Sequence, residues 1–424
     1  MSGSDASKVR GPQRAGVLDA LRVGEFRALV GAQIASEAGD QVARVALALL
    51  VLADTGSALL AAATFAVSFV PTFLGAALLG PLADRFSRKS LMLLADVARA
   101  AAVGALALAA GPDAPLWLLF ALLFVAELFT PLFESARAAS IPDILPTPGL
   151  VTAGTGLTRS LHLANQAIGL VAGGLIVQLT SPRVALFVNA LSFIVSYAII
   201  AAFMRSRPAS LEGTSSVGEL LADLRDGFTM LMGDVSRRAL VLLGWGMAAS
   251  LVAPEAVALA YVRSNDELDA FGGVLMAAVI TGAALGSILV GRRRPADQLD
   301  LVLPLAIGVC LPLLLTGIEP PIVVLIVLWF LSGMAQAFLV PVMSFTTLLT
   351  PNDNRGRVVG IASAGFAAFT ALGYLVSGWV ADRTSPAFSV TFMAVVGLVV
   401  VSIAFLRWPA RRLVDDLRGL EDGG

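Results

Sequence analysis

The chain has 424 residues, of which 57% are hydrophobic and only 14% are charged. Soluble domains carry about 25% charged residues, so this composition excludes a soluble protein and requires a solvent that is largely lipid. The formal net charge of -1 gives no indication of a charged partner.

The predicted elements follow a simple order along the chain. Residues 1–25 are polar and basic, without the short apolar core of a cleavable signal peptide, and we expect a cytoplasmic tail there. The later apolar runs are continuous and about 20 residues long, which favours membrane-spanning helices over strands. They predict an all-α membrane protein with two six-helix bundles. The spans are 26–53, 57–82, 90–111, 114–138, 153–179, 183–204, 239–262, 270–290, 299–318, 321–345, 357–381 and 387–407.

The two predicted bundles, 26–204 and 239–407, are separated by a polar linker at 205–238, and 408–424 forms a second cytoplasmic tail. Within the linker, VGELLADLRDGFTMLM has apolar residues at helical spacing. This pattern fits either an amphipathic helix on the membrane surface or a plain connection.

Positive charge gathers on one side of the membrane if there are twelve spans. Arginine and lysine occur before helix 1, after helices 2, 8 and 10, in the linker and in the C-terminal tail. The opposite loops hold only Arg183, Arg263 and Arg383. By the positive-inside rule, both termini are therefore predicted to be cytoplasmic. Abundant alanine and arginine with almost no lysine indicate a GC-rich bacterial genome, and so the bacterial inner membrane.

The two halves repeat weakly. GLVAGGLIVQLTSP begins at Gly169, and GYLVSGWVADRTSP begins 204 residues later at Gly373. The same shift places Ser87–Lys89 on Gly291–Arg293. Two matches at one shift indicate duplication, and transporters built from such repeats hold their substrate between the halves near the midplane.

The segment GPLADRFSRKS, from Gly80 to Ser90, places charges between two apolar runs. Asp84 ends the second predicted span, where a carboxylate can face the positive N-terminal end of another helix. The charges could instead serve only to fix the topology, but topology alone needs no acid at Asp84. The segment resembles the signature between helices 2 and 3 of the major facilitator superfamily, G-x-L-A-D-R-x-G-R-[KR]. The matching residues are Gly80, Leu82, Ala83, Asp84, Arg85, Arg88 and Lys89, whereas Ser87 replaces the usual glycine.

The resemblance covers essentially the whole chain. ASEAGDQVARVALALLVLADTGSA, LLADVARA, ESARAASIPDILP and LFVNALSFIVSYAI further resemble the drug:proton antiporter branch, which contains macrolide and siderophore exporters. The resemblance implies a cytoplasmic gate at Gly80–Lys89 that locks the two halves together when the cavity opens outward. Asp84 would face the start of helix 11, while Arg85 and Arg88 would reach acids at the cytoplasmic end of helix 4, of which Glu134 is the chosen candidate. Asp96 and Arg99 on helix 3 would join this gate.

Helix 1 carries a polar stripe that lipid would not tolerate. Gln33, Glu37, Asp40 and Arg44 are spaced to share one helix face. Ionisable residues at membrane depth cost at least ~2.5 kcal/mol each, so they are functional candidates. Burial disfavours the charged form of Asp40 and Arg44 favours it, which predicts Asp40 as the proton carrier with Glu37 as its accessory. The alternative is a static Asp40–Arg44 pair that only holds the packing.

Helices 4 and 5 add further candidates. Glu127 lies near the middle of helix 4 without a basic neighbour on its own turn, and it is the second proton-carrier or cation-binding candidate. Helix 5 presents Arg159, His162 and Gln166 on one face. Arg159 is expected to neutralise an acid on helix 1 or 4. His162 either titrates or packs through hydrogen bonds.

The second half is poorer in buried charge. Glu255 follows Pro254 toward the outer end of helix 7, where it could receive cationic drugs or act as an outer gate, and Gln336 marks helix 10. In the superfamily that the chain resembles, helices 1, 4, 7 and 10 line the cavity. The predicted substrate-cavity residues are Gln33, Arg159, His162, Gln166, Glu255 and Gln336.

Several classes of function lack the residues they need. There is no G-x-x-x-x-G-K-[ST] loop for ATP, Cys310 is the only cysteine, and His162 is the only histidine. We therefore predict a non-enzymatic, monomeric transporter without metal, cofactor or nucleic-acid partner. It would export drug- or siderophore-like lipophilic molecules by alternating access, driven by the proton motive force. A permease that imports a small polar metabolite and a non-transporting membrane sensor or scaffold are the alternatives.

Overall fold

The computed structural model describes residues 16–71, 86–111, 114–207 and 217–422, where every regular element is a helix. The elements in chain order are α1 (Val17–Leu21), α2 (Gly24–Thr55), α3 (Ala58–Ala66), α6 (Arg88–Ala109), α7 (Leu116–Leu128), α8 (Thr130–Ile144), α9 (Pro148–Leu179), α10 (Pro182–Phe203), α11 (Val217–Gly233), α12 (Val235–Ser264), α13 (Asp269–Gly291), α14 (Pro295–Leu314), η1 (Leu315–Ile318), α15 (Ile322–Ala335), η2 (Gln336–Phe338), α16 (Leu339–Leu348), η3 (Asn352–Asn354), α17 (Arg355–Arg383), α18 (Pro386–Leu406) and α19 (Ala410–Asp422).

The described helices confirm a multi-pass membrane protein. Ten segments are long and apolar enough to span a membrane. α2 corresponds to the first predicted span, and its 32 residues extend about 48 Å at 1.5 Å per residue, although its charges set it apart from the ten. α3 begins the second predicted span, and residues 72–82 of that span lie outside the described residues. The count of twelve therefore stays a prediction.

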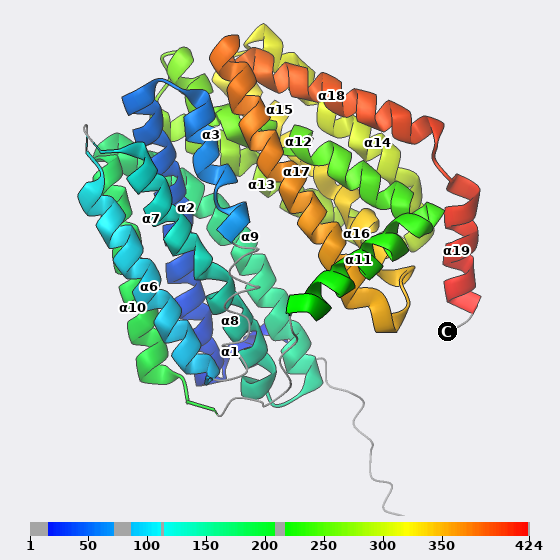
Figure 1. The fold of residues 1–424 in the computed structure, drawn as a ribbon, viewed down its shortest axis with the longest axis horizontal. Helices are drawn as coiled ribbons and strands as arrows, with labels where there is room; N and C mark the ends of the chain where they lie inside the picture. Colours follow the sequence, from blue (N-terminus) through cyan, green and yellow to red (C-terminus); the bar gives the residue numbers. More distant parts are fainter. Residues whose placement is uncertain (1–15, 72–85, 112–113, 208–216, 423–424) are drawn as a thin grey trace, which may run out of the picture.

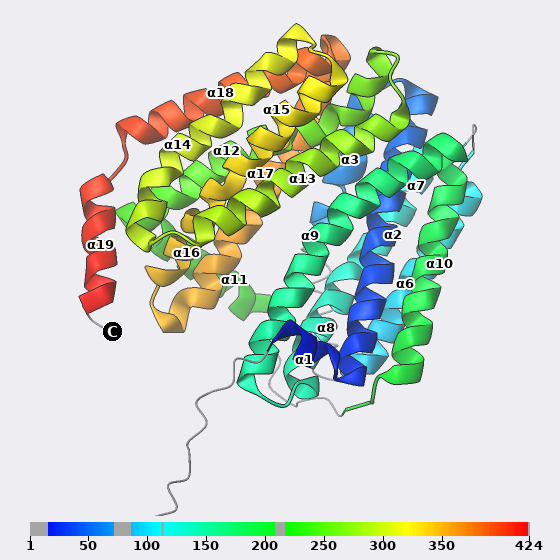
Figure 2. The same ribbon diagram turned by 180° about the vertical axis from the view of Figure 1, so that it is seen from behind.

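The helices form two groups that lie side by side (Figures 1 and 2). α2, α3 and α6 to α10 make the N-terminal group, and α12 to α18 make the C-terminal group. Across the boundary, α9 packs against α13, α3 packs against α17, and α2 touches α12. Both views show the groups meeting at the end that contains the start of α3 and the end of α17, which we call the joined end. They diverge toward the end where α11 and α19 lie.

Close backbone approach seals the joined end. A Cβ atom on Gly273 of α13 would lie 2.2 Å from the carbonyl oxygen of Leu170 on α9, so a larger residue cannot fit there. One turn away, the side-chain oxygen of Gln178 accepts a hydrogen bond from the backbone N–H of Asp269 at 2.9 Å. Packing and polar contacts therefore both hold the two groups together at this end.

The repeated Thr-Ser-Pro segments have a local structural cause. In both Thr180–Pro182 and Thr384–Pro386 the serine is an N-cap whose hydroxyl accepts the backbone N–H three residues later, and the proline opens the helix. Serine is a preferred N-cap, and proline at the first helical position loses no intrahelical bond. Equivalent caps 204 residues apart agree with a duplicated fold.

The fourth predicted span (α7 and α8) and the tenth (α15, η2 and α16) are both interrupted near a proline. α7 ends at Leu128 and α8 begins at Thr130, just before Pro131. Because proline has no N–H, Pro131 leaves the carbonyl of Glu127 without its usual helical donor. In the other group the short 3-10 segment η2, which contains Gln336, precedes Pro341. Two of the predicted site residues therefore lie at helix interruptions.

The linker contains a helix that packs on the protein. A Cβ atom on Gly227 of α11 would lie 2.6 Å from Ile361 on α17. Leu231 is fully buried and joins a small cluster with Val241 and Val358. α11 therefore rests on the C-terminal group, and its contact with a membrane surface stays a prediction.

Candidate functional site

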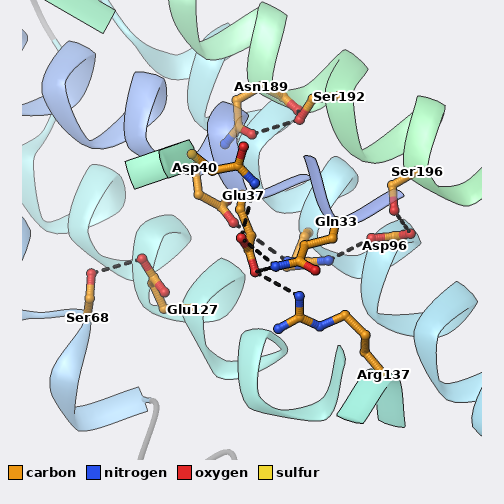
Figure 3. A network of polar contacts seen from close by, with 12 residues as sticks. Gln33, Glu37, Asp40, Ser68, Asp96, Glu127, Arg137, Asn189, Ser192 and Ser196 are labelled. Carbon is orange, nitrogen blue, oxygen red and sulfur yellow. Dashed lines mark hydrogen bonds and ion pairs between the residues drawn. The ribbon is translucent and has the colours of Figure 1, made fainter. Parts of the chain in front are cut away.

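Charged side chains gather inside the N-terminal group, at the centre of Figure 3. The four carboxylates there are Glu37, Asp40, Asp96 and Glu127, and each lies within 4.0 Å of an arginine nitrogen. A buried charge is very costly without a partner, so such pairing is what allows these acids to stay inside. The four acids come from α2, α6 and α7, and tertiary packing decides which base each one meets.

Glu127 binds Arg44. The Nη2 and Nε atoms of Arg44 donate to the same Glu127 oxygen at 3.0 and 3.2 Å, and the Ser68 hydroxyl donates to that oxygen at 2.9 Å. Arg44 thus pairs with an acid 83 residues away on another helix. The alternative of a static Asp40–Arg44 pair within helix 1 is not seen, because α7 brings the Glu127 carboxylate directly against the Arg44 guanidinium.

Asp40 instead faces Arg99. The Nη1 atom of Arg99 lies 3.7 Å from an Asp40 oxygen, and its Nη2 atom donates to Asp96 at 2.6 Å. The Ser196 hydroxyl donates to the second Asp96 oxygen at 2.7 Å. The prediction that Asp96 and Arg99 belong to the cytoplasmic gate is wrong. Their side chains are 0% and 2% exposed inside the N-terminal group, beside Asp40.

The Arg99 guanidinium is fixed between two aromatic rings. Its central carbon lies 4.5 Å from the ring centre of Phe133 and 4.4 Å from that of Phe193. A cation over an aromatic face is attracted by the ring quadrupole, and burial strengthens the attraction. Arg99 is therefore a fixed positive charge, with Asp96 as its close partner and Asp40 as its more distant one.

Glu37 forms a second group toward α8 and α9. The Gln33 amide donates to both Glu37 oxygens at 3.1 Å, and the Asn165 amide donates at 3.2 Å. The Nη1 atom of Arg137 lies 3.0 Å from Glu37, and Nδ1 of His162 lies 3.5 Å from it. The His162 side chain is 48% exposed, so it links the Glu37 carboxylate to the protein surface.

The site contains a small cavity and several buried polar atoms without a hydrogen-bond partner among the described residues. A cavity of about 20 Å³ lies between Asp40, Arg99 and Glu127. That volume is enough for about one water molecule, and buried polar groups without protein partners commonly bind water. The exposed wall of this cavity is mostly apolar, and among the unpartnered buried atoms that the structure describes only Arg99 Nε belongs to a residue that lines it. Buried atoms without a hydrogen-bond partner among the described residues include Gln33 Oε1, Ser36 Oγ, Arg99 Nε and Arg137 Nε.

The described part of the predicted gate binds within one group. Arg88 pairs with Asp143 near the end of α8, so it meets an acid at the expected end of helix 4 but not the chosen residue, Glu134. Arg88 also donates to the carbonyl of Ala139 at 2.6 Å. Lys89 donates to two carbonyls at the end of α10, both at 2.8 Å, where a cation favourably meets the negative helix terminus. Gly80, Asp84 and Arg85 lie outside the described residues, so their part of the gate stays a prediction.

The remaining candidates are spread around the boundary between the groups. Arg159 is exposed and forms no ion pair in the part of the chain that the structure describes, so the expected neutralisation of an acid is not seen. Glu255 faces the Tyr374 hydroxyl and lies within electrostatic range of Arg44. Gln336 makes one long contact, 3.5 Å, to the Leu251 carbonyl. Gln166 is partly buried on α9.

Sequence reasoning missed some of the most important partners. Arg137 is a charge inside the predicted fourth span, and the cost of such a charge could have identified it. Ser68, Asn165 and Ser196 are common polar residues in otherwise apolar helices, and nothing in their spacing marks them as partners of Glu127, Glu37 and Asp96. Their roles come from helix juxtaposition.

A sequence profile of transmembrane secretion effectors matches residues 15–419. The chain belongs to this family of the major facilitator superfamily. The match covers nearly the whole chain and confirms the resemblance drawn from the Gly80–Ser90 segment and the antiporter-like landmarks. A member of this family is a transporter rather than an enzyme.

Curated relatives of this family member are efflux proteins and a transporter. The multidrug efflux pump Tap of Mycobacterium tuberculosis is 26% identical over 395 residues, covering 91% of this chain and 93% of the pump. The MFS-type transporter YfiS of Bacillus subtilis is 25% identical, covering 92% and 94%. Macrolide efflux protein A of Streptococcus pyogenes is 23% identical over 221 residues, about half of each chain.

Solved structures of other transporters share the fold. The nucleoside transporter NupG superposes with a TM-score of 0.72 at 13% identity, covering 91% of this chain and 99% of NupG. A bacterial homologue of the lysosomal transporter Spinster, solved in an inward-facing and unoccupied conformation, gives 0.66 at 14% identity, covering 92% and 98%. At these identities the likeness shows the shared fold alone.

Proposed function

We propose that this family member exports lipophilic small molecules in exchange for protons by alternating access. The named activities of the Tap and macrolide efflux relatives support export. The observation that carries the proton coupling is the pair of acid–arginine contacts, Asp40 with Arg99 and Glu127 with Arg44, around one water-sized cavity. The proton motive force takes the place of a cofactor.

Protonation of Glu127 or Asp40 would weaken the contact of that acid with its arginine. Protonating Glu127 removes the charge that holds Arg44, and protonating Asp40 removes the more distant partner of Arg99 while leaving Asp96 in place. The released arginine must then find another partner, and Glu255 of the other group lies within electrostatic range of Arg44. A proton bound inside the N-terminal group thereby changes the balance of charge across the boundary. The gradient supplies about 2.3 kcal/mol per 100 mV and about 1.4 kcal/mol per pH unit.

The distribution of positive charge indicates how the protein is oriented in the membrane. Both termini and the linker are proposed to be cytoplasmic, which makes the joined end, where the two groups pack together, the outer one. Among the predicted cavity residues, His162 is exposed and Gln166, Glu255 and Gln336 are partly buried, whereas Gln33 is fully buried. A green fluorescent protein fused to the C-terminus should fluoresce in bacteria, because it folds in the cytoplasm, whereas a periplasmic reporter there should stay inactive.

Inside-out vesicles with an imposed pH gradient provide the test. The wild-type protein should move ethidium, a fluorescent lipophilic cation, against its gradient. Asp40→Asn and Glu127→Gln should each abolish uphill movement while proteoliposomes retain downhill movement. Asp300→Asn removes an exposed acid and is the matched control.

The possible outcomes test the proton-carrying residues and the export function separately. Uphill transport that survives in both site variants would show that other groups carry the proton. Ethidium movement that is absent in wild-type vesicles, and absent again with a macrolide substrate, would refute export of this class of molecule.

A further inference from the structure

A contact between an acid and a helix start joins the two groups at the joined end. Asp382 lies near the end of α17, in the C-terminal group, and its carboxylate caps the start of α3 in the N-terminal group. One oxygen accepts the backbone N–H of Ala58 at 2.5 Å, and the other accepts the Ser57 hydroxyl at 2.6 Å and the N–H of Leu59 at 3.3 Å. The first N–H groups of a helix have no partner in the helix itself, and a carboxylate there also meets the positive end of the helix dipole.

The cap is assembled from both groups. Within the N-terminal group, the Ser57 hydroxyl accepts the N–H of Leu60 at 3.2 Å, so α3 keeps one cap of its own. Asp382 supplies the remainder from the other group. If the groups separate, water can replace Asp382 while Ser57 keeps the first turn of α3 in place. The contact can therefore be broken and remade without unfolding the helix.

The two arginines near Asp382 make contacts elsewhere, so the Asp382 carboxylate is directed to the start of α3. The neighbouring Arg383 lies over the Trp379 ring at 4.1 Å. Arg263, which lines the same surface pocket, binds Asp269 through two 2.9 Å hydrogen bonds. That pocket of about 490 Å³ has walls from both groups and gives water access to the cap.

Close packing beside Asp382 supports the contact. A Cβ atom on Gly378, one turn earlier, would lie 2.6 Å from the Cα atom of Leu59, so only glycine lets α17 approach α3 this closely. The sequence from Gly378 to Arg383 reads Gly-x-x-Ala-Asp-Arg, and so does the sequence from Gly80 to Arg85. The hexapeptide of the superfamily signature thus occurs a second time, at the end of α17.

We propose that Asp382 is a positioning residue that latches the joined end shut and must release α3 for that end to open. This inference rests on the proposed alternating access, since a rigid protein would have no second state to release. Other contacts at this end, such as Gln178 with Asp269, remain when Asp382 is replaced. Loss of the latch should therefore shift the population of states rather than abolish the closed state.

Distances between spin labels at both ends of the full-length protein in nanodiscs test the latch. With Cys310 replaced by alanine, one label pair is placed at Leu179 and Ile318, at the joined end, and a second pair at Phe203 and Leu406, at the other end. All four side chains are exposed, so labels there disturb no packing. Asp382→Ala removes every cap contact, and Asp382→Asn keeps the shape and one acceptor oxygen. Asp54→Asn, an exposed acid at the same end, is the matched control.

The latch predicts opposite changes at the two ends. In Asp382→Ala the closed-to-open ratio at the joined end should fall about tenfold, because a hydrogen bond to a charged group is worth roughly one factor of ten. The distances at the other end should shorten in the same sample. Asp382→Asn should give a smaller shift, and Asp54→Asn should give none. If Asp382→Ala does not fold, the Asn variant decides by the same measurement.

Parallel ethidium efflux separates this inference from the proposed function. Unchanged distances in the Asp382 variants, with wild-type efflux present, would overturn the latch and leave the function standing. Shifted distances with no efflux in the wild-type protein would support the latch and refute the function. Lengthening at both ends together would also overturn the latch, because it indicates loosened packing rather than exchange between two states.

Discussion

Replacing Arg99 by leucine should destabilise the protein far more than the same substitution at an exposed arginine. Arg99 is 2% exposed, binds Asp96 at 2.6 Å and lies 3.7 Å from Asp40. Leucine keeps apolar contact with the surrounding rings but leaves both carboxylates without their cation. Breaking a buried ion pair by removing one partner costs about 3–5 kcal/mol, because the remaining charge stays buried.

The stacking contributes a second, smaller loss. Phe133 and Phe193 lie on the guanidinium at 4.5 and 4.4 Å, and a desolvated cation–π contact is worth about 2 kcal/mol. Apolar contact from leucine offsets part of this loss, so the total expected from the broken pair and the lost stacking is about 4–6 kcal/mol. Arg99→Lys keeps the charge but loses the planar stacking and the fork of donors, so it should fall between leucine and wild type.

Thermal unfolding in detergent, followed by size-exclusion chromatography of a fluorescent fusion, gives the ranking. Arg159→Leu is the control, because Arg159 is exposed and forms no ion pair among the described residues, and such surface changes stay within about 0.5 kcal/mol. Asp96→Asn should rescue part of the Arg99→Leu loss, since it removes one of the stranded charges. If Arg99→Leu unfolds at the same temperature as Arg159→Leu, the assignment of Arg99 as the counter-charge of Asp96 and Asp40 is wrong.

Three further substitutions test the packing and the surface contacts. Gly282→Ala places a Cβ atom 2.2 Å from the Phe330 carbonyl oxygen and should cost about 1–3 kcal/mol, whereas Gly104→Ala, with open space around it, should be neutral or stabilising in the same melting assay. Lys89→Met removes two hydrogen bonds from the end of α10 and should cost about 1–2 kcal/mol, and an unchanged midpoint would show that solvent replaces them. Asp143→Asn breaks a partly exposed pair with Arg88 and should cost under about 1 kcal/mol, so a large drop in the midpoint would contradict its surface character.

The membrane-spanning character of the chain was predictable because hydropathy is a local property. A run of apolar residues of sufficient length forms a helix in lipid wherever it occurs, since its backbone must satisfy itself. The polar stripe on helix 1 was visible for the same reason, because helical spacing fixes which residues share a face. The serine caps of the repeated Thr-Ser-Pro segments are also local, and they occur where the repeat predicts equivalent helix starts.

The identity of each partner was not predictable, because ion pairing depends on which helices meet. Asp40 and Arg44 are four residues apart on one helix, yet each binds a side chain from another helix. Asp96 and Arg99 pair with each other as their spacing allows, but packing of α6 against α8 and α10 places them in the interior of the N-terminal group.

The sequence by itself determined an all-helical membrane protein with two related halves and acids stranded at membrane depth. Only the tertiary structure decided that Glu127 meets Arg44, that Arg99 lies between two aromatic rings, and that Asp382 caps a helix of the opposite group. Hydrophobic length and helical phase are set within each segment. A buried charge is stabilised only by whichever opposite charge or free N–H the packing brings to it, however distant that group is along the chain.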